Sequence, residues 1–208
     1  ESHKLIRAND AVGTLGPDLF GDEVNLYTGA LSFGVVDIDL PGNSELPVRI
    51  ARKFDADSIG GIRSTNGFLA GLFGDWDLDL PMIHGTFSAA DGFVVDDDSG
   101  PHRRCTNFDA PRAVGTEGQL FNANEFWNGT SLYIPGMGDQ EILKRFDPNS
   151  PAPGGVPAAY PLVTKNHWQI GCNVTLKNPK PNLPVGDVDE GFSVLSPSGV
   201  RYIFDWST

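Results

Sequence analysis

Residues 191–206 read GFSVLSPSGVRYIFDW, two alternating apolar runs on either side of a four-residue turn. In the turn, residues 196–199 (SPSG), proline in the second position and glycine in the fourth are typical of a type I turn. Side chains alternate between the two faces of a strand, so the second run predicts one aromatic-rich face. That face carries Val200, Tyr202, Phe204 and Trp206. An isolated hairpin is at best marginally stable, and we therefore expect another element to pack on it.

The composition favours an all-β protein. The chain has 208 residues, of which 25 are glycine and 16 are proline, with no collagen-like period. Turns and loops are therefore abundant, and long helices are not expected. We predict antiparallel hairpins that form a sandwich-like or open curved sheet, with long Pro/Gly-rich loops and little helix.

The net charge of −12 disfavours nucleic acid and anionic lipid as partners, because both are negatively charged. No stretch approaches the roughly 20 apolar residues that a membrane-spanning helix needs. The chain begins at Glu1, and we interpret it as a processed piece whose signal peptide has been removed or lies outside it.

Four segments are expected along the chain. Residues 1–20 lack periodicity and are interpreted as an arm or loop, and residues 21–146 as the main β domain. Residues 147–163 form a proline-rich loop, because proline excludes helix interiors and central strands. Residues 164–208 hold the terminal strands, which we expect to form one globular unit with 21–146.

Two local patterns are specific enough to test. The apolar phase slips by one residue at Val35-Val36, which predicts a β-bulge. Asp91-Gly92 and Asn128-Gly129 are dipeptides typical of short hairpin turns. His84 is interpreted as a turn residue and His167 as a strand residue.

The two cysteines allow a single pairing, Cys105 with Cys172, across 172 − 105 = 67 residues. Alternation from Thr164 to Leu176 places Cys172 on the apolar face. Few lysines, many Gly, Asn and Asp residues, and no redox or metal spacing favour an exported protein with a disulfide. Such a bridge could contribute up to about 4 kcal/mol. The alternative is two buried thiols.

Several runs resemble those of bacterial RHS/YD-repeat proteins. Residues 20–48, FGDEVNLYTGALSFGVVDIDLPGNSELPV, are similar to the segment that precedes the repeats in that family. Residues 71–81 (GLFGDWDLDLP) and 167–172 (HWQIGC) also fit this leader region, and residues 191–206 resemble a YD-repeat hairpin. The resemblance extends from about Phe20 onward.

The resemblance implies the N-terminal region of a secreted, wall-associated or polymorphic-toxin protein, at the bacterial cell surface or outside the cell. In that family a spiral β-sheet encloses a C-terminal toxic or processed domain. This chain has one or two candidate units and no residues that match the self-cleaving core, so enclosure and autoproteolysis are not assigned to it. We expect a non-enzymatic capping module that contacts downstream repeats or a second copy. The expected contact residues are Phe192, Tyr202, Phe204 and Trp206.

An extracellular glycan-binding β-sandwich, with Ca²⁺ as a candidate ligand, is the alternative. Trp127 and Tyr133 flank the Asn128-Gly129 turn and could form a stacking platform, but core packing is favoured because Trp and Tyr normally bury most of their area. The calcium candidates are acidic side chains: Asp75, Asp77, Asp79, Asp96 and Asp98. Same-face strand positions lie roughly 7 Å apart, so one Ca²⁺ would need further oxygen ligands from loops, such as Asp187, Asp189 and Glu190. A solvated acidic strand face is the competing interpretation.

No catalytic or cofactor-binding residues are predicted. The chain lacks CxxC, H-E-x-x-H and G-x-S-x-G patterns, and the only enzyme class left open is a carboxylate-based glycoside hydrolase. The triplet His102-Arg103-Arg104 is the only concentrated positive site. It could pair with the acidic loops or form a solvated patch.

Overall fold

The computed structural model describes residues 22–24, 31–40, 48–55, 76–88, 91–116, 118–147, 152–155, 157–180, 183 and 187–207. The chain forms two compact units, Glu1–Leu80 and Pro81–Thr208, so the range 21–146 is divided between them. The predicted arm 1–20 and Asp75 lie outside the described residues. Both units are built from antiparallel strands, which confirms the all-β prediction.

The first unit contains a four-stranded sheet in the order β1-β2-β3-β4. Its strands are β1 (Asp22–Val24), β2 (Leu31–Leu40), β3 (Val48–Asp55) and β4 (Asp77–Leu78). The β2–β3 register shifts between Val36 and Ile38, which confirms a bulge within one residue of the predicted position. The extra residue allows Val35 and Ile38 to share a face although an odd number of positions separates them.

The bulge residue Asp37 accepts two hydrogen bonds from the Arg52 guanidinium, at 2.6 and 2.8 Å. This hydrogen bonding lowers the pKa of Asp37 and raises that of Arg52. Arg52 also lies 5.4 Å from the ring centroid of Trp76, and Trp76 packs against Phe54 with centroids 5.7 Å apart. The centre of this sheet is therefore held by an ion pair and an aromatic contact.

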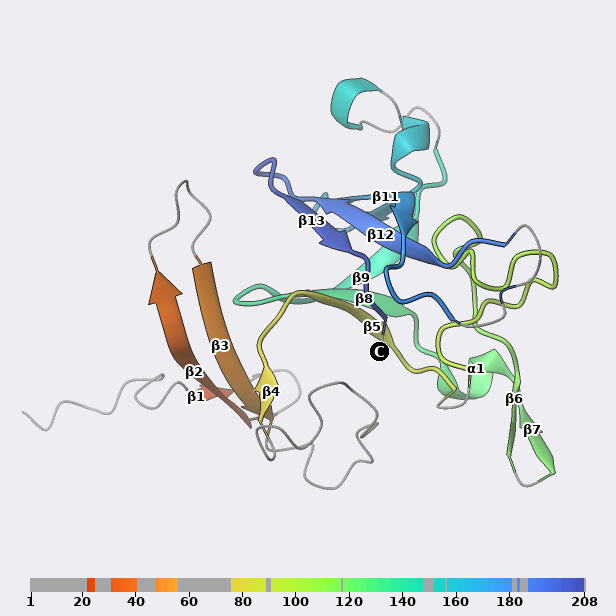
Figure 1. The fold of residues 1–208 in the computed structure, drawn as a ribbon, viewed down its shortest axis with the longest axis horizontal. Helices are drawn as coiled ribbons and strands as arrows, with labels where there is room; N and C mark the ends of the chain where they lie inside the picture. Colours follow the sequence, from red (N-terminus) through yellow and green to blue (C-terminus); the bar gives the residue numbers. More distant parts are fainter. Residues whose placement is uncertain are drawn as a thin grey trace, which may run out of the picture. The chain divides into compact units, whose positions relative to one another are not determined.

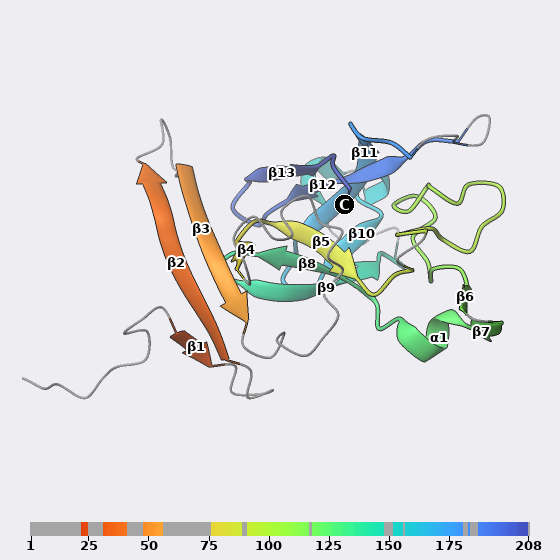
Figure 2. The same ribbon diagram turned by 60° about the horizontal axis from the view of Figure 1, so that its bottom comes forward.

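The second unit contains a curved seven-stranded sheet in the order β13-β12-β11-β10-β9-β8-β5 (Figures 1 and 2). Its strands are β5 (Met82–Gly85), β8 (Thr130–Ile134), β9 (Gly138–Lys144), β10 (Leu162–Thr164), β11 (Gln169–Thr175), β12 (Glu190–Leu195) and β13 (Arg201–Phe204). Strands from residues 82–144 and from the terminal region thus share one sheet. Within the predicted proline-rich loop the structure has two short 3₁₀ helices, η3 (Pro153–Gly155) and η4 (Pro157–Ala159), and β10 begins at Leu162.

Three further elements complete the second unit. The strands β6 (Val114–Thr116) and β7 (Gln119–Phe121) form a separate two-stranded ribbon, and α1 (Ala123–Phe126) follows it directly. The backbone N–H of Asn122 donates to the Glu125 carboxylate at 2.6 Å, and this N-terminal bond explains where α1 begins.

The core of the second unit lies on one face of the seven-stranded sheet. Trp168 and Tyr202 pack with ring centroids 5.6 Å apart. The partly buried side chains of Phe93 and Ile83 pack against the core. The buried members are Cys105, Phe108, Leu132, Ile134, Ile142, Leu162, Trp168, Ile170, Phe192 and Val194.

The terminal hairpin forms as the sequence predicts. The backbone N–H of Gly199 donates to the Ser196 carbonyl at 3.0 Å, which closes the turn, and Gly199 has a φ of 89° that favours glycine. In β13 the odd positions Arg201 and Ile203 are exposed, while Tyr202 and Phe204 are partly buried against the core. Trp206 follows the strand and is 61% exposed, so it does not continue the packed face.

Of the two dipeptides predicted to form hairpin turns, one forms a turn and the other does not join two strands. Asn128-Gly129 does not join two strands, because α1 precedes it and the β8–β9 hairpin closes instead at residues 135–137. Gly136 and Gly138 supply the positive φ values, 76° and 71°, at that hairpin. Asp91-Gly92 does form a turn, but only a single bridge joins Ser88 to Gly92.

The two histidine predictions are wrong. His84 lies in strand β5, where its Nε2 is 2.7 Å from Asp139 Oδ1 on β9. His167 lies in the turn before β11 and has a φ of 64°. Histidine is one of the residues that adopt a positive φ more readily, which explains His167 in a turn. In β5, His84 has the Asp139 carboxylate, two strands away in the same sheet, as its polar partner.

Gly191 in β12 is expected to tolerate no side chain. A Cβ at this position would collide with the backbone carbonyl oxygen of Phe204, so β13 would have to move away. We expect Gly191→Ala to lower the free energy of unfolding by about 1–3 kcal/mol, as overpacking does. Urea unfolding measures this, with Gly136→Ala as a comparison in which strain comes from the positive φ alone and no atom lies within 4 Å.

Candidate functional site: a disulfide and its ionic junction

The predicted disulfide is present. Cys105 lies in the loop that follows residue 100, and it is bonded to Cys172 of β11 with a Cα–Cα distance of 5.3 Å. Cys105 is fully buried, whereas Cys172 is partly exposed. The bridge therefore fixes a loop to the seven-stranded sheet.

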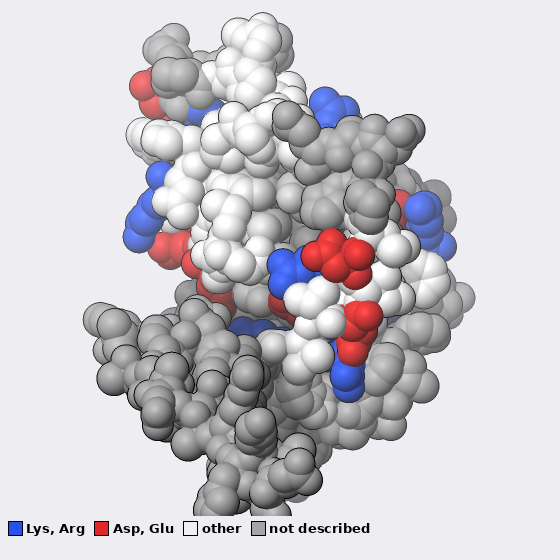
Figure 3. Space-filling view, turned by 90° about the vertical axis from the view of Figure 1, so that its left-hand side faces the viewer, with Lys and Arg blue, Asp and Glu red and all other residues white. Residues whose placement is uncertain are grey.

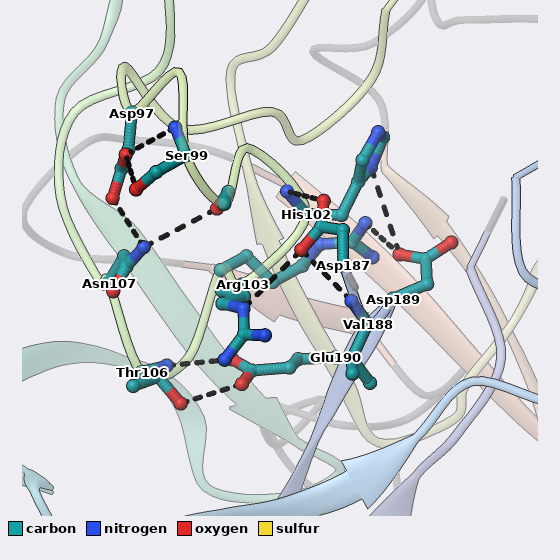
Figure 4. A network of polar contacts seen from close by, with 12 residues as sticks. Asp97, Ser99, His102, Arg103, Thr106, Asn107, Asp187, Val188, Asp189 and Glu190 are labelled. Carbon is teal, nitrogen blue, oxygen red and sulfur yellow. Dashed lines mark hydrogen bonds and ion pairs between the residues drawn. The ribbon is translucent and has the colours of Figure 1, made fainter. Parts of the chain in front are cut away.

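Beside the disulfide, the basic triplet meets the acidic segment 187–190 (Figure 4). The Arg104 guanidinium binds the Asp189 carboxylate, and both side chains are buried, with 5% and 0% of each residue exposed. Arg103 Nε lies 3.4 Å from Asp187 Oδ1. We call residues 102–106 together with residues 187–190 the ionic junction.

Glu190 joins the two sides of the ionic junction through three accepted hydrogen bonds. The backbone N–H groups of Cys105 and Thr106 donate to Glu190 Oε2 at 3.1 and 2.8 Å, and Thr106 Oγ1 donates to Glu190 Oε1 at 2.6 Å. The second oxygen of Asp189 accepts the backbone N–H of Lys180 at 2.7 Å. Charge-assisted bonds of this kind are stronger than neutral ones, so the loop is tightly held.

Burial lowers the pKa of the Arg104 guanidinium, and the adjacent Asp189 carboxylate opposes this effect. The nearby His102 imidazole has its Nδ1 4.0 Å from Asp189 Oδ1, and that buried nitrogen has no hydrogen-bond partner among the described residues. A buried guanidinium needs a paired carboxylate, since an isolated buried charge is very costly. The arrangement therefore has a structural role: it holds the loop in place, and each carboxylate oxygen binds a donor group of the protein.

The interpretation of His102-Arg103-Arg104 as a solvated patch is therefore wrong for Arg104, and pairing with an acidic loop is correct. The sequence signal was a basic triplet next to Cys105 and a cluster of Asp187, Asp189 and Glu190. Because 85 positions separate Arg104 from Asp189, no local pattern identified them as partners.

A second polar turn lies in the same loop. Asp97 accepts hydrogen bonds from the Ser99 hydroxyl at 2.7 Å, from the Ser99 backbone N–H at 2.8 Å and from Asn107 Nδ2 at 2.5 Å. The two bonds from Ser99, led by that of its hydroxyl, lower the pKa of Asp97. The bonds favour the ionised form, as expected for a carboxylate that accepts several donors.

Asp97 is therefore expected to contribute to acid unfolding. A depressed pKa in the folded state stabilises the protein above the unfolded value of about 3.9, and this stabilisation is lost as the pH falls through the folded pKa. We expect Asp97→Asn to flatten the decrease in stability below about pH 4, and to leave the slope between pH 6 and 8 unchanged. Urea unfolding at several pH values tests this, and an unchanged acid slope would contradict it.

The calcium candidates do not converge. Among the residues that the structure describes, no group of three or more His, Cys, Asp or Glu side chains could hold a metal ion. Asp98 pairs with Arg112 at 3.0 Å and is fully exposed, and Asp96 is also exposed. Asp79 is partly buried and takes part in another interaction, whereas nothing is described for the side chain of Asp77. The additional ligands proposed from residues 187–190 are instead bonded to protein N–H and guanidinium groups.

The stacking candidates lie on different elements. Trp127 follows α1 and is partly buried, with its Nε1 shielded from solvent, while Tyr133 lies in β8 beside Met82 and Asp139. Neither residue presents a fully exposed ring, and glycan stacking stays a prediction. Phe192, expected at an interface, is only 4% exposed and belongs to the core, where it packs in one cluster with Ile170 and Val194.

Acidic and basic side chains are mixed on the face drawn in Figure 3, where red and blue groups stand beside one another. Ion pairs at the surface include Lys144–Asp109 at 2.9 Å and Lys177–Asp205 at 2.8 Å. Within the described ranges, none of the helices has the length and apolar character needed to cross a membrane.

The fold and the ionic junction define an all-β protein of antiparallel strands, cross-linked by one disulfide in its second unit. Comparison of the chain with protein-family models, with curated proteins and with solved structures finds no significant match.

Proposed function

We propose that the chain is a non-enzymatic structural module, in which the β13 edge of the seven-stranded sheet receives a further β-hairpin. The parent would be an exported protein of the RHS/YD-repeat kind, as the sequence resemblance implies, and the module would cap its repeats. The observation that carries the proposal is the place of β13, which has β12 as its only strand neighbour among the described residues.

The backbone pattern of β13 supports pairing at this edge. Ser196 N–H donates to the Val200 carbonyl at 2.8 Å, and bonded pairs alternate along an antiparallel ladder. With the observed register, the backbone groups of Arg201 and Ile203 then point away from β12. An edge strand of this kind is a template for the addition of another strand.

The side chains at this edge are also suited to a contact. Ile203 is 51% exposed and Trp206 is 61% exposed, whereas Tyr202 and Phe204 already pack against the core. The proposed contact therefore rests on Ile203, Trp206 and the edge backbone, and Phe192 is no longer part of it. Repeat arrays need an atypical terminal unit, because an open end exposes both backbone and apolar groups.

The disulfide supports an extracellular or cell-surface location. Disulfides persist in oxidising compartments and are rare in reducing ones. The carboxylates of the ionic junction do not form a free pair that suggests catalysis, because they bind N–H and guanidinium groups of the loop at residues 102–106.

The test is the association state of the 208-residue chain, alone and with a peptide that carries two tandem copies of residues 191–206. We expect concentration-dependent association or binding of the peptide in sedimentation equilibrium. Ile203→Lys should abolish it, and Met137→Lys, at a residue 56% exposed in the β8–β9 turn, should not. A chain that stays monomeric and does not bind the peptide would exclude the β13 edge as a docking strand.

A further inference from the structure

The two cysteines of the disulfide lie in different surroundings. Cys105 is 0% exposed and belongs to the core cluster. Cys172 is partly exposed and lines a surface cavity of about 370 Å³. The other lining residues are Thr106, Ala158, Ala159, Pro161 and Asn173. A small molecule in this cavity therefore meets the Cys172 side of the bridge.

This asymmetry determines how thiol–disulfide exchange would proceed. A thiolate attacks one sulfur along the S–S axis, and the other sulfur leaves as a thiolate. Because access is from the cavity, the attacked atom is Sγ of Cys172 and the leaving atom is Sγ of Cys105.

We propose that the Cys105–Cys172 disulfide is a redox-sensitive site of the folded protein, reduced through the cavity by a small dithiol. The first thiolate of the dithiol forms a mixed disulfide with Cys172, and the Cys105 thiolate leaves with the bonding electron pair and takes up a proton. The second thiolate of the dithiol then attacks its own mixed-disulfide sulfur and releases Cys172. The dithiol loses two electrons and becomes a disulfide, and the protein gains two thiols.

The ionic junction explains why the fold survives this reaction. After the S–S bond is broken, Glu190 still accepts the N–H groups of Cys105 and Thr106 and the Thr106 hydroxyl. Arg104, next to Cys105, still pairs with Asp189, next to Glu190. The loop is thus fastened to the start of β12 independently of its covalent link to β11.

The reduced protein would carry two unlike thiols. Cys105 stays inside the core, where electrophiles do not reach it, while Cys172 lines the cavity. Reactivity of a cysteine follows its exposure and its thiolate fraction, so Cys172 is the thiol that a small electrophile would modify.

The experiment treats the full chain with dithiothreitol without denaturant, then with iodoacetamide, and locates the label by peptide mass spectrometry. We expect one carbamidomethyl group per chain, on Cys172, with an unchanged near-UV circular dichroism spectrum. Two outcomes would overturn the proposal: no reduction until denaturant is added, or equal labelling of both cysteines in the wild-type chain.

A matched pair of variants tests the role of the ionic junction. Asp189→Asn weakens the remaining fastening, so the reduced variant should take two labels per chain. Asp98→Asn removes a carboxylate of an exposed ion pair and should still give one label. If the Asp189→Asn variant also takes a single label on Cys172, the ionic junction does not hold the reduced loop.

Discussion

Asp189→Asn is expected to lower the free energy of unfolding by about 3–5 kcal/mol, as does the loss of one partner of a buried ion pair. The carboxylate binds the buried Arg104 guanidinium with one oxygen and the Lys180 backbone N–H with the other. When the Asp189 charge is removed, the Arg104 guanidinium stays buried and loses the carboxylate that contacts it. Urea unfolding of the variant measures the loss as a lower midpoint at an unchanged slope.

Two further variants separate the orphaned charge from a general loss of contacts. Asp98→Asn, which removes the fully exposed carboxylate of the pair with Arg112, should change the midpoint little, since water screens an exposed ion pair. The double variant Arg104→Met/Asp189→Asn should be more stable than Asp189→Asn alone, because it no longer buries an unpaired cation. A double variant that is less stable than Asp189→Asn would contradict this account of the loss.

The elements that the sequence predicted well are those with strong local signals. The terminal hairpin was predictable because proline and glycine fix the turn at residues 196–199 and strict alternation fixes the faces of both strands. The bulge near Asp37 was predictable because an inserted residue is the ordinary cause of a one-residue phase slip within an apolar strand.

The elements that failed depend on partners far along the chain or on competing local signals. Asn128-Gly129 is a strong turn dipeptide, but a helix start signal at Asn122 and Glu125 precedes it, and β8 finds both of its neighbours elsewhere. Trp206 continues the alternation of β13 in the sequence, yet its backbone lies beyond the strand. Ser207 N–H there donates to Asn178 Oδ1 at 2.9 Å.

Of the candidate site, the disulfide could be predicted from the sequence. Cysteine arithmetic allowed one bridge, and the inward position of Cys172 agreed with it. Pairing of the basic triplet with an acidic loop was one of two interpretations, but the individual partners were not predictable, because the β11–β12 pairing and the disulfide together bring residues 102–106 to 187–190. Charge clusters show only that partners are needed, and tertiary structure decides which partners are found.

Removal of the disulfide by the double substitution Cys105→Ala/Cys172→Ala is expected to lower the free energy of unfolding by about 4 kcal/mol. A cross-link across 67 residues restricts the unfolded chain, and that restriction is lost in the variant. Because the unfolded state then expands and exposes more surface, the slope of urea unfolding should increase while the midpoint falls. Asp189→Asn acts on the folded state and should leave the slope unchanged, so the two fastenings of one loop are distinguishable by slope. Equal slopes for the wild-type chain and the cysteine double variant would show that the bridge does not act through the unfolded state, and the stabilisation expected from loop length would then be wrong.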